Sequence, residues 1–193
     1  MSILDGLPKS EAEWQQVMKI GQPLLGYMEA STVMTPQQKK NWQHVKEGIP
    51  LSDLLGITKE EREAGLAQGC RLIKQKQMKE ARAILLQLYT IYPYDARVPY
   101  AIAISFQLEG DISAAAKLFV QATALDATNP DGYLRLGECF LAAREYENAA
   151  GSFEGARDLC ERGYGSPKTQ QYATRMLEHV MARIDALEAK STD

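Results

Sequence analysis

The sequence contains little of what metal sites, disulfide frameworks and membrane spans require. Its two histidines, His44 and His179, have no partners at metal-ligand spacing, so we expect no metal site. Its cysteines are few, widely spaced and without a CxxC pair, which is typical of reduced, mostly buried thiols in a cytosolic protein. No apolar run is long enough to cross a bilayer, so we expect no stable membrane insertion.

The charge balance and the start of the chain exclude further classes. The formal net charge is -3, so the chain lacks the basic surface that nucleic acid and anionic membranes attract. Residues 1–8 lack the basic start and apolar run of a signal peptide. We therefore expect a cytoplasmic protein that binds no nucleic acid.

No group of residues indicates catalysis. Cys139 follows Glu138 on one predicted helix and has no histidine partner, so we interpret it as a small packed residue. The serine in residues 151–155 does not follow a strand as a nucleophile elbow would, and the glycines in residues 163–165 lack the βαβ context of a dinucleotide site. We expect neither enzymatic activity nor a cofactor, and no residues remain for a separate catalytic domain.

What the sequence does contain is an internal repeat. One stretch has a large residue, a Leu-Gly pair and an aromatic residue, followed by an alanine, a second aromatic residue and a second alanine. This is the spacing of a 34-residue tetratricopeptide unit. The small residue in the first helix, Gly137, gives the second helix room to cross closely. In the last unit these positions are Tyr133, Leu136, Gly137, Phe140, Ala149, Phe153 and Ala156.

The same columns recur in the two preceding units. They are Ile102, Ala103, Phe106, Ala115, Phe119 and Ala122, and before them Gly69, Leu72, Ala81, Leu85 and Leu88, followed by Pro93. We predict an all-α tetratricopeptide-repeat solenoid of three helix pairs, with repeats at about 62–95, 96–129 and 130–163. A generic helical bundle with accidental spacing is the alternative.

Cap and turn residues set the predicted helix boundaries. Thr58 with Glu61 opens the first repeat, and Ser166-Pro167 opens a last helix with an apolar stripe. The boundaries between them fall at Lys76-Gln77, Asp95, Glu109-Gly110-Asp111, Asn129-Pro130, Ala143-Arg144-Glu145 and Gly163-Tyr164-Gly165. The stripe of the last helix consists of Tyr172, Met176, Val180, Ile184 and Leu187. We predict that it covers the exposed face of the third repeat, as the end of a solenoid requires.

This pattern divides the chain into three parts, residues 1–57, 58–163 and 164–193. They are an N-terminal helical region, the three repeats, and a C-terminal capping helix with its tail. The N-terminal region has helix starts at Ser10 and at Thr35-Pro36. Its role is either a cap for the solenoid or a dimerisation or partner-binding arm. The apolar residues that would pack on the solenoid or on a second copy are Trp14, Val17, Met18 and Trp42.

The first helix of each repeat is expected to line a concave peptide-binding groove. The inward positions are the second, fifth, ninth and twelfth of each repeat. The predicted groove residues are Leu66, Cys70, Ile73, Arg97, Tyr100, Ile104, Gln107, Leu134, Glu138 and Leu141, with Glu63 and Asp131 beside them. Their apolar members would form a continuous trough, and an exposed apolar patch of that size usually marks a binding site. Alternatively, the N-terminal segment or the end helix fills the trough, or the frame is shifted by one residue.

The composition of the trough indicates its ligand. Repeat proteins that bind a carboxylate tail place several cations on this face, whereas Arg97 is the only cation among the inward positions here. An extended apolar peptide is therefore the predicted ligand.

The sequence resembles the class II type III secretion chaperones, the SycD/LcrH-like proteins that protect translocators. The resemblance covers about residues 45–160 and lies in Leu88–Asp95, Ala101–Gly110, Leu136–Ala142 and the apolar stretch Gly48–Ile57. It implies a bacterial cytoplasmic homodimer that acts in virulence. Such a chaperone binds hydrophobic, pore-forming translocator subunits in its groove and keeps them soluble until secretion. The alternative is a generic tetratricopeptide-repeat adaptor that scaffolds other cytosolic proteins.

Overall fold

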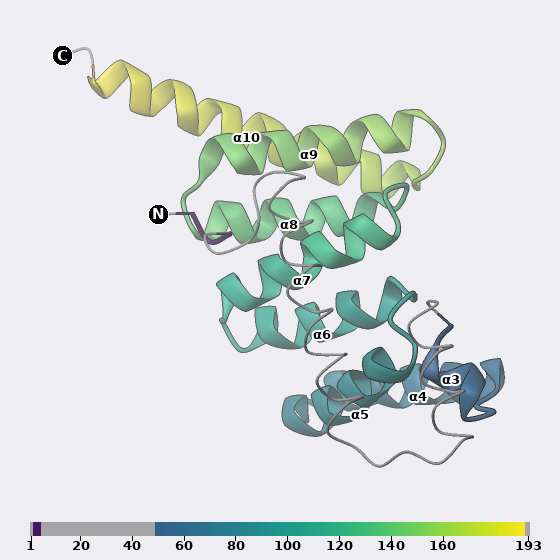
Figure 1. Ribbon diagram of the computed structural model, residues 1–193. Coiled ribbons are helices and arrows are strands. Elements are labelled where there is room, and N and C mark those ends of the chain that lie inside the picture. Colours follow the sequence, from purple (N-terminus) through teal and green to yellow (C-terminus); the bar gives the residue numbers. More distant parts are fainter. Residues whose placement is uncertain (1, 5–48, 192–193) are drawn as a thin grey trace, which may run out of the picture. The chain divides into compact units, whose positions relative to one another are not determined.

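The computed structural model (Figure 1) describes residues 2–4 and 49–191 of the chain. The chain divides into two compact units, one formed by Asp5–Thr58 and the other by Met1–Leu4 together with Lys59–Asp193. The described part of the first unit contains the short helix α3, Leu51–Leu54. The helices predicted to start at Ser10 and Thr35 lie outside the described residues. So do the predicted dimerisation residues Trp14, Val17, Met18 and Trp42.

The second unit is a row of antiparallel helices, each packed on the next along the chain. Across residues 2–4 and 49–191 all regular secondary structure is helical, which confirms the all-α tetratricopeptide-repeat fold. The three pairs are α4 (Lys59–Lys74) with α5 (Met78–Ile91), α6 (Arg97–Leu108) with α7 (Ile112–Leu125), and α8 (Pro130–Ala142) with α9 (Tyr146–Glu161). The long helix α10 (Pro167–Ser191) ends the row.

Side-chain hydrogen bonds cap the first turns of three of these helices at the predicted positions. The side-chain oxygen of Asn129 accepts from the backbone N–H of Asp131 at 3.0 Å, and Pro130 is the first residue of α8. The carboxylate of Asp111 accepts from the N–H of Ala114 at 3.1 Å, which caps α7. Ser166 caps α10 in the same way. Polar side chains therefore satisfy backbone N–H groups that a helix start leaves without partners.

The turn inside each repeat has the same backbone conformation. Lys76, Gly110 and Arg144 are spaced by 34 residues and have positive φ values of 60°, 85° and 62°. Glycine adopts this region freely, whereas a residue with a Cβ is strained there. The repeat is thus visible in the backbone as well as in the side chains.

The close crossing of the helices in a pair depends on one small residue facing one large residue. A Cβ atom at Gly137 would lie 2.8 Å from the ring of Phe153, and one at Gly69 would lie 2.6 Å from Leu85. In the second repeat the equivalent positions are Ala103 and Phe119, which belong to one core cluster. The large residue of each pair is fully buried, so these columns form the centre of the core.

Helix α10 covers the third repeat by packing along α9. Val180 of the predicted stripe is fully buried. Three other residues of the stripe, Tyr172, Met176 and Ile184, pack on the core. The prediction for Leu187 was wrong, because this side chain is 49% exposed. The reason is length: α10 has 25 residues and α9 has 16, so the last turns of α10 extend past its partner (Figure 1).

Candidate peptide-binding face

Polar contacts join the first helices of successive repeats along one face. Arg97 of α6 bonds to Glu63 of α4, and Gln107 of α6 bonds to Glu138 of α8. Tyr172 of α10 also bonds to Glu138, so α10 takes the place of a fourth first helix. We call this surface, formed by α4, α6, α8 and α10, the first-helix face. The predicted groove residues come from the first three of these helices.

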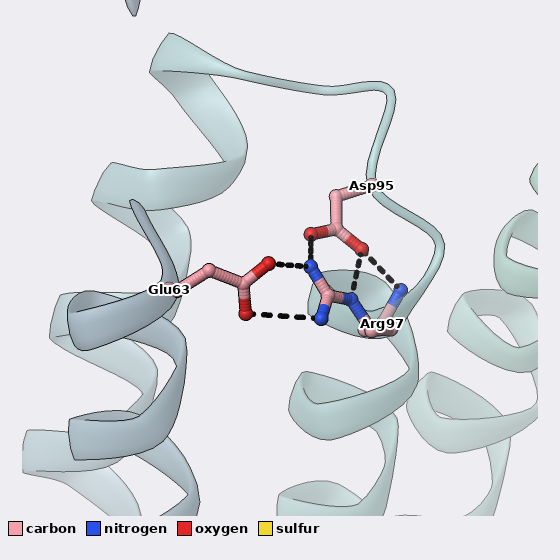
Figure 2. A network of polar contacts seen from close by, with 3 residues as sticks. All are labelled: Glu63, Asp95 and Arg97. Carbon is pink, nitrogen blue, oxygen red and sulfur yellow. Dashed lines mark hydrogen bonds and ion pairs between the residues drawn. The ribbon is translucent and has the colours of Figure 1, made fainter. Parts of the chain in front are cut away.

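Arg97 is held between two carboxylates (Figure 2). Its Nη1 and Nη2 donate to Glu63 at 3.0 and 2.6 Å, while its Nε and Nη2 donate to Asp95 at 2.9 and 2.6 Å. The second carboxylate is that of Asp95 rather than that of Asp131, which the repeat frame placed beside Arg97. Hydrogen bonding to Arg97 lowers the pKa of Glu63. Burial acts to raise the pKa of Asp95, but its hydrogen bonds to Arg97 outweigh burial and lower it.

Glu138 connects three helices at the centre of the face. Its carboxylate accepts from Gln107 Nε2 at 3.2 Å, from Arg135 Nη1 at 2.9 Å and from the Tyr172 hydroxyl at 2.9 Å. Burial and the hydrogen bond to Glu138 raise the pKa of Tyr172, so this hydroxyl keeps its proton. The middle of the face is therefore polar, and the prediction of a continuous apolar trough was wrong.

The apolar positions of the predicted groove fall into two groups. Leu66 and Leu134 are only 8% and 7% exposed, and each belongs to a core cluster. The ring of Tyr100 is half-buried and meets Phe119 edge-on with centroids 5.4 Å apart. The half-buried apolar residues that pack on the core and keep an exposed side are Cys70, Ile73, Ile104 and Leu141.

A cleft of about 460 Å³ lies between α6, α8 and α10. Its lining is Tyr100, Asp131, Leu134, Arg135, Glu138, Lys168, Thr169 and Tyr172. The sequence reasoning missed Arg135, Lys168 and the polar role of Tyr172, since it treated the last helix as a cap with an apolar stripe. A signal was present: Lys168 and Tyr172 follow Leu134 and Glu138 by 34 residues, as a fourth first helix would.

The thiol of Cys139 is fully buried. Burial, with a smaller effect of Glu138, raises the pKa of the Cys139 thiol to about 12, so this thiol carries no nucleophilic thiolate. Among residues 2–4 and 49–191, no three His, Cys, Asp or Glu side chains are grouped to hold a metal ion. No helix within the same residues is long and apolar enough to span a membrane.

No protein-family model matches the chain, and no curated protein matches it. Solved structures do. A type III secretion complex from Aeromonas hydrophila aligns with a TM-score of 0.68 and 23% identity, over 73% of this chain and 94% of that one. The Yersinia enterocolitica chaperone SycD, in complex with a peptide of the translocator YopD, aligns with a TM-score of 0.59 and 19% identity, over 66% and 97%. The chain shares the fold of the translocator chaperones.

The same fold also occurs in a protein with another kind of ligand. The first tetratricopeptide domain of Spaghetti (RPAP3), bound to the HSP90 peptide SRMEEVD, aligns with a TM-score of 0.59 and 19% identity, over 66% of this chain and 96% of that one. Because one fold serves both, the ligand of this chain has to be argued from its own side chains.

Proposed function

We propose that this protein is a cytoplasmic chaperone of a bacterial type III secretion system. It binds an extended apolar segment of a hydrophobic translocator on the first-helix face and keeps the translocator soluble and competent for secretion. The fold shared with SycD in its complex with a YopD peptide supports this proposal. The observation that carries it is that Arg97 and Arg135 are already paired with carboxylates, whereas apolar side chains of the face remain partly exposed.

The charge of the face argues against an acidic peptide as ligand. The HSP90 peptide SRMEEVD carries three acidic residues and one basic residue. The charged residues that line its clefts are Glu63, Asp95, Asp126, Asp131 and Glu138, against Lys59, Arg62, Arg97, Arg135 and Lys168. The acidic and basic side chains balance, so the face lacks the net positive charge that would favour an acidic ligand. An adaptor that binds acidic C-terminal peptides is therefore a weaker candidate than a translocator chaperone.

The apolar side chains provide the favourable free energy of binding. Ile73, Ile104 and Leu141 are half-buried in the empty protein, so a ligand can bury the rest of their surface. Each translocator side chain that becomes fully buried there contributes roughly 1.5–3 kcal/mol. A few such anchors, less the cost of ordering the peptide, give an affinity on the order of micromolar or better.

The polar centre of the face suits the backbone of an extended segment. Arg135 places N–H donors, and Glu138 and Tyr172 place acceptor oxygens, next to the cleft of about 460 Å³, where peptide N–H and C=O groups need partners once water is excluded. Binding of this kind needs neither a nucleotide nor turnover. Self-association through residues 1–57 stays a prediction.

The test is co-expression with a translocator encoded in the same type III secretion gene cluster. The proposal predicts that the translocator moves from the pellet to the soluble fraction and co-purifies with this protein, and that the peptide SRMEEVD does not compete with it. A translocator that remains insoluble beside well-expressed protein would contradict the proposal. Binding of SRMEEVD at micromolar concentration would favour the adaptor instead.

A further inference from the structure

The beginning of the chain lies against the turns of the second and third repeats. The backbone N–H of Ile3 donates to Glu145 Oε1 at 2.6 Å, and the hydroxyl of Ser2 donates to Glu145 Oε2 at 2.9 Å. The hydroxyl of Ser113 donates to the carbonyl of Ile3 at 3.1 Å. These bonds join residues that are separated by more than a hundred positions in the sequence. The segment is drawn in purple in Figure 1.

The aliphatic side chains of this segment are part of the same contact. Ile3 and Leu4 are half-buried and pack against the core cluster that contains Phe119 and Phe153. The hydroxyl oxygen of Ser2 also accepts from the N–H of Leu4 at 3.2 Å, which holds the segment in shape. The backbone of Ile3, the hydroxyl of Ser2 and the side chains of Ile3 and Leu4 therefore all contact the repeats.

Glu145 binds residues 2–4 with the carboxylate that its equivalent in the second repeat uses as a helix cap. Asp111, 34 residues earlier, uses its carboxylate to cap its own helix by accepting from the N–H of Ala114. Glu145 occupies the same position before α9 but makes no such cap. Its two carboxylate oxygens instead accept hydrogen bonds from the Ile3 N–H and the Ser2 hydroxyl. The side-chain amide of Asn148 also donates to Glu145, at 2.8 Å.

The electrostatics of the contact agree with this assignment. Burial acts to raise the pKa of Glu145, but hydrogen bonds from Ile3, Asn148 and Ser2 outweigh burial and lower it. The charged carboxylate is the form that accepts from all three donors.

We propose that the turns preceding α7 and α9, together with Ser113 and Glu145, form a second peptide-binding site that is separate from the first-helix face. The site recognises a short turn segment with a serine followed by two aliphatic residues, through one backbone N–H, one backbone C=O and the apolar pair. The chain's own residues 2–4 occupy it and thereby anchor the beginning of the chain to the second and third repeats. This inference is independent of the function proposed for the first-helix face.

The decisive experiment measures hydrogen exchange of the Ile3 amide in the full chain by NMR. We expect exchange at least tenfold slower than in an unstructured peptide, and loss of this protection in Glu145→Ala. Glu147→Ala is the matched control, because Glu147 is exposed in the first turn of α9 and makes no hydrogen bond to the segment within the described residues. Equal exchange in the wild type and in Glu145→Ala would overturn the proposal.

A second experiment tests recognition in trans. The double variant Ile3→Asp/Leu4→Asp places negative charge beside Glu145 and should release the segment from its site. A fluorescent peptide with the sequence of residues 1–8 should then bind this variant at least tenfold more tightly than it binds the wild type. Adding Glu145→Ala should abolish binding, whereas adding Glu147→Ala should not. Equal binding to both chains, or no binding to the opened variant, would overturn the assignment of a peptide-binding site.

Discussion

The most quantitative prediction concerns two glycines inside helices of the third repeat. Gly137 lies in α8, where a Cβ atom would come within 2.8–2.9 Å of three ring atoms of Phe153. Gly151 lies in α9, where a Cβ atom would meet nothing within 4 Å. The same substitution, glycine to alanine, should therefore stabilise the protein at Gly151 but not at Gly137.

The magnitudes follow from two opposing effects. Alanine is favoured over glycine in a helix interior by about 1 kcal/mol, and this gain applies at both sites. At Gly137 the added methyl group overpacks a core in which Phe153 is 0% exposed and cannot yield, which costs roughly 1–3 kcal/mol. Gly151→Ala should therefore stabilise by about 1 kcal/mol, and Gly137→Ala should lie roughly 1–3 kcal/mol below it.

Thermal unfolding followed by circular dichroism at 222 nm measures the difference. For a chain of this size 1 kcal/mol corresponds to roughly 2–4 °C, so the two melting temperatures should differ by at least ~2 °C. A Gly137→Ala/Phe153→Leu double variant should lose less stability than the sum of its single variants, because the smaller side chain relieves the clash. If Gly137→Ala raised the melting temperature as much as Gly151→Ala, the close crossing of α8 and α9 would be refuted.

Three further predictions test other parts of the structure. Phe153→Ala should cost roughly 3–5 kcal/mol in the free energy of unfolding by urea denaturation, because it empties a fully buried site; a loss below 1 kcal/mol would contradict that burial. Cys139 should resist a thiol reagent at pH 8 until the protein unfolds, since it is fully buried with a pKa of about 12; rapid native labelling of this residue by mass spectrometry would contradict this. The lowered pKa of Asp95 means that its stabilising effect is present above its unfolded value of about 3.9 and is lost as pH falls below it. Stability between pH 5 and 3 should therefore fall more steeply in the wild type than in Asp95→Asn, and parallel curves would contradict the contribution of its ion pair with Arg97.

The helix pairs could be predicted from the sequence because their signals are local. The two residues that meet at the crossing of α8 and α9, Gly137 and Phe153, are 16 positions apart, and a small and a large residue stand at the equivalent positions of each repeat. Asn129-Pro130 specifies a helix start through its own hydrogen bond and fixed φ angle. Each of these features depends on neighbouring residues, which a repeat frame captures.

The site was harder to predict because it depends on directions and on distant contacts. The repeat frame gave the position of Leu134 but not its burial, which depends on how the neighbouring helices pack around it. The frame ended at the third repeat, so the bond between Tyr172 and Glu138 was missed. The contact between Ile3 and Glu145 spans 142 positions, and a turn residue gives no local signal for it.

The central claim is that a translocator segment binds to the first-helix face, and Ile104 tests it best. This side chain is half-buried on α6, so part of it is open to a ligand and a substitution there should still allow the protein to fold. Leu134 is less suitable, since at 7% exposure its replacement by a charged residue would test folding instead. Leu86→Glu is the matched control, because it introduces the same charge at an apolar residue that is 49% exposed on α5.

The most direct measurement is the dissociation constant of the purified translocator segment, determined by isothermal titration calorimetry with the wild type, Ile104→Glu and Leu86→Glu. An unpaired charge in an apolar contact is strongly unfavourable, so Ile104→Glu should weaken binding at least tenfold, or by about 1.4 kcal/mol, while Leu86→Glu should leave it unchanged. Both variants should still unfold cooperatively. Wild-type affinity in Ile104→Glu, or an equal loss in Leu86→Glu, would contradict binding on the first-helix face.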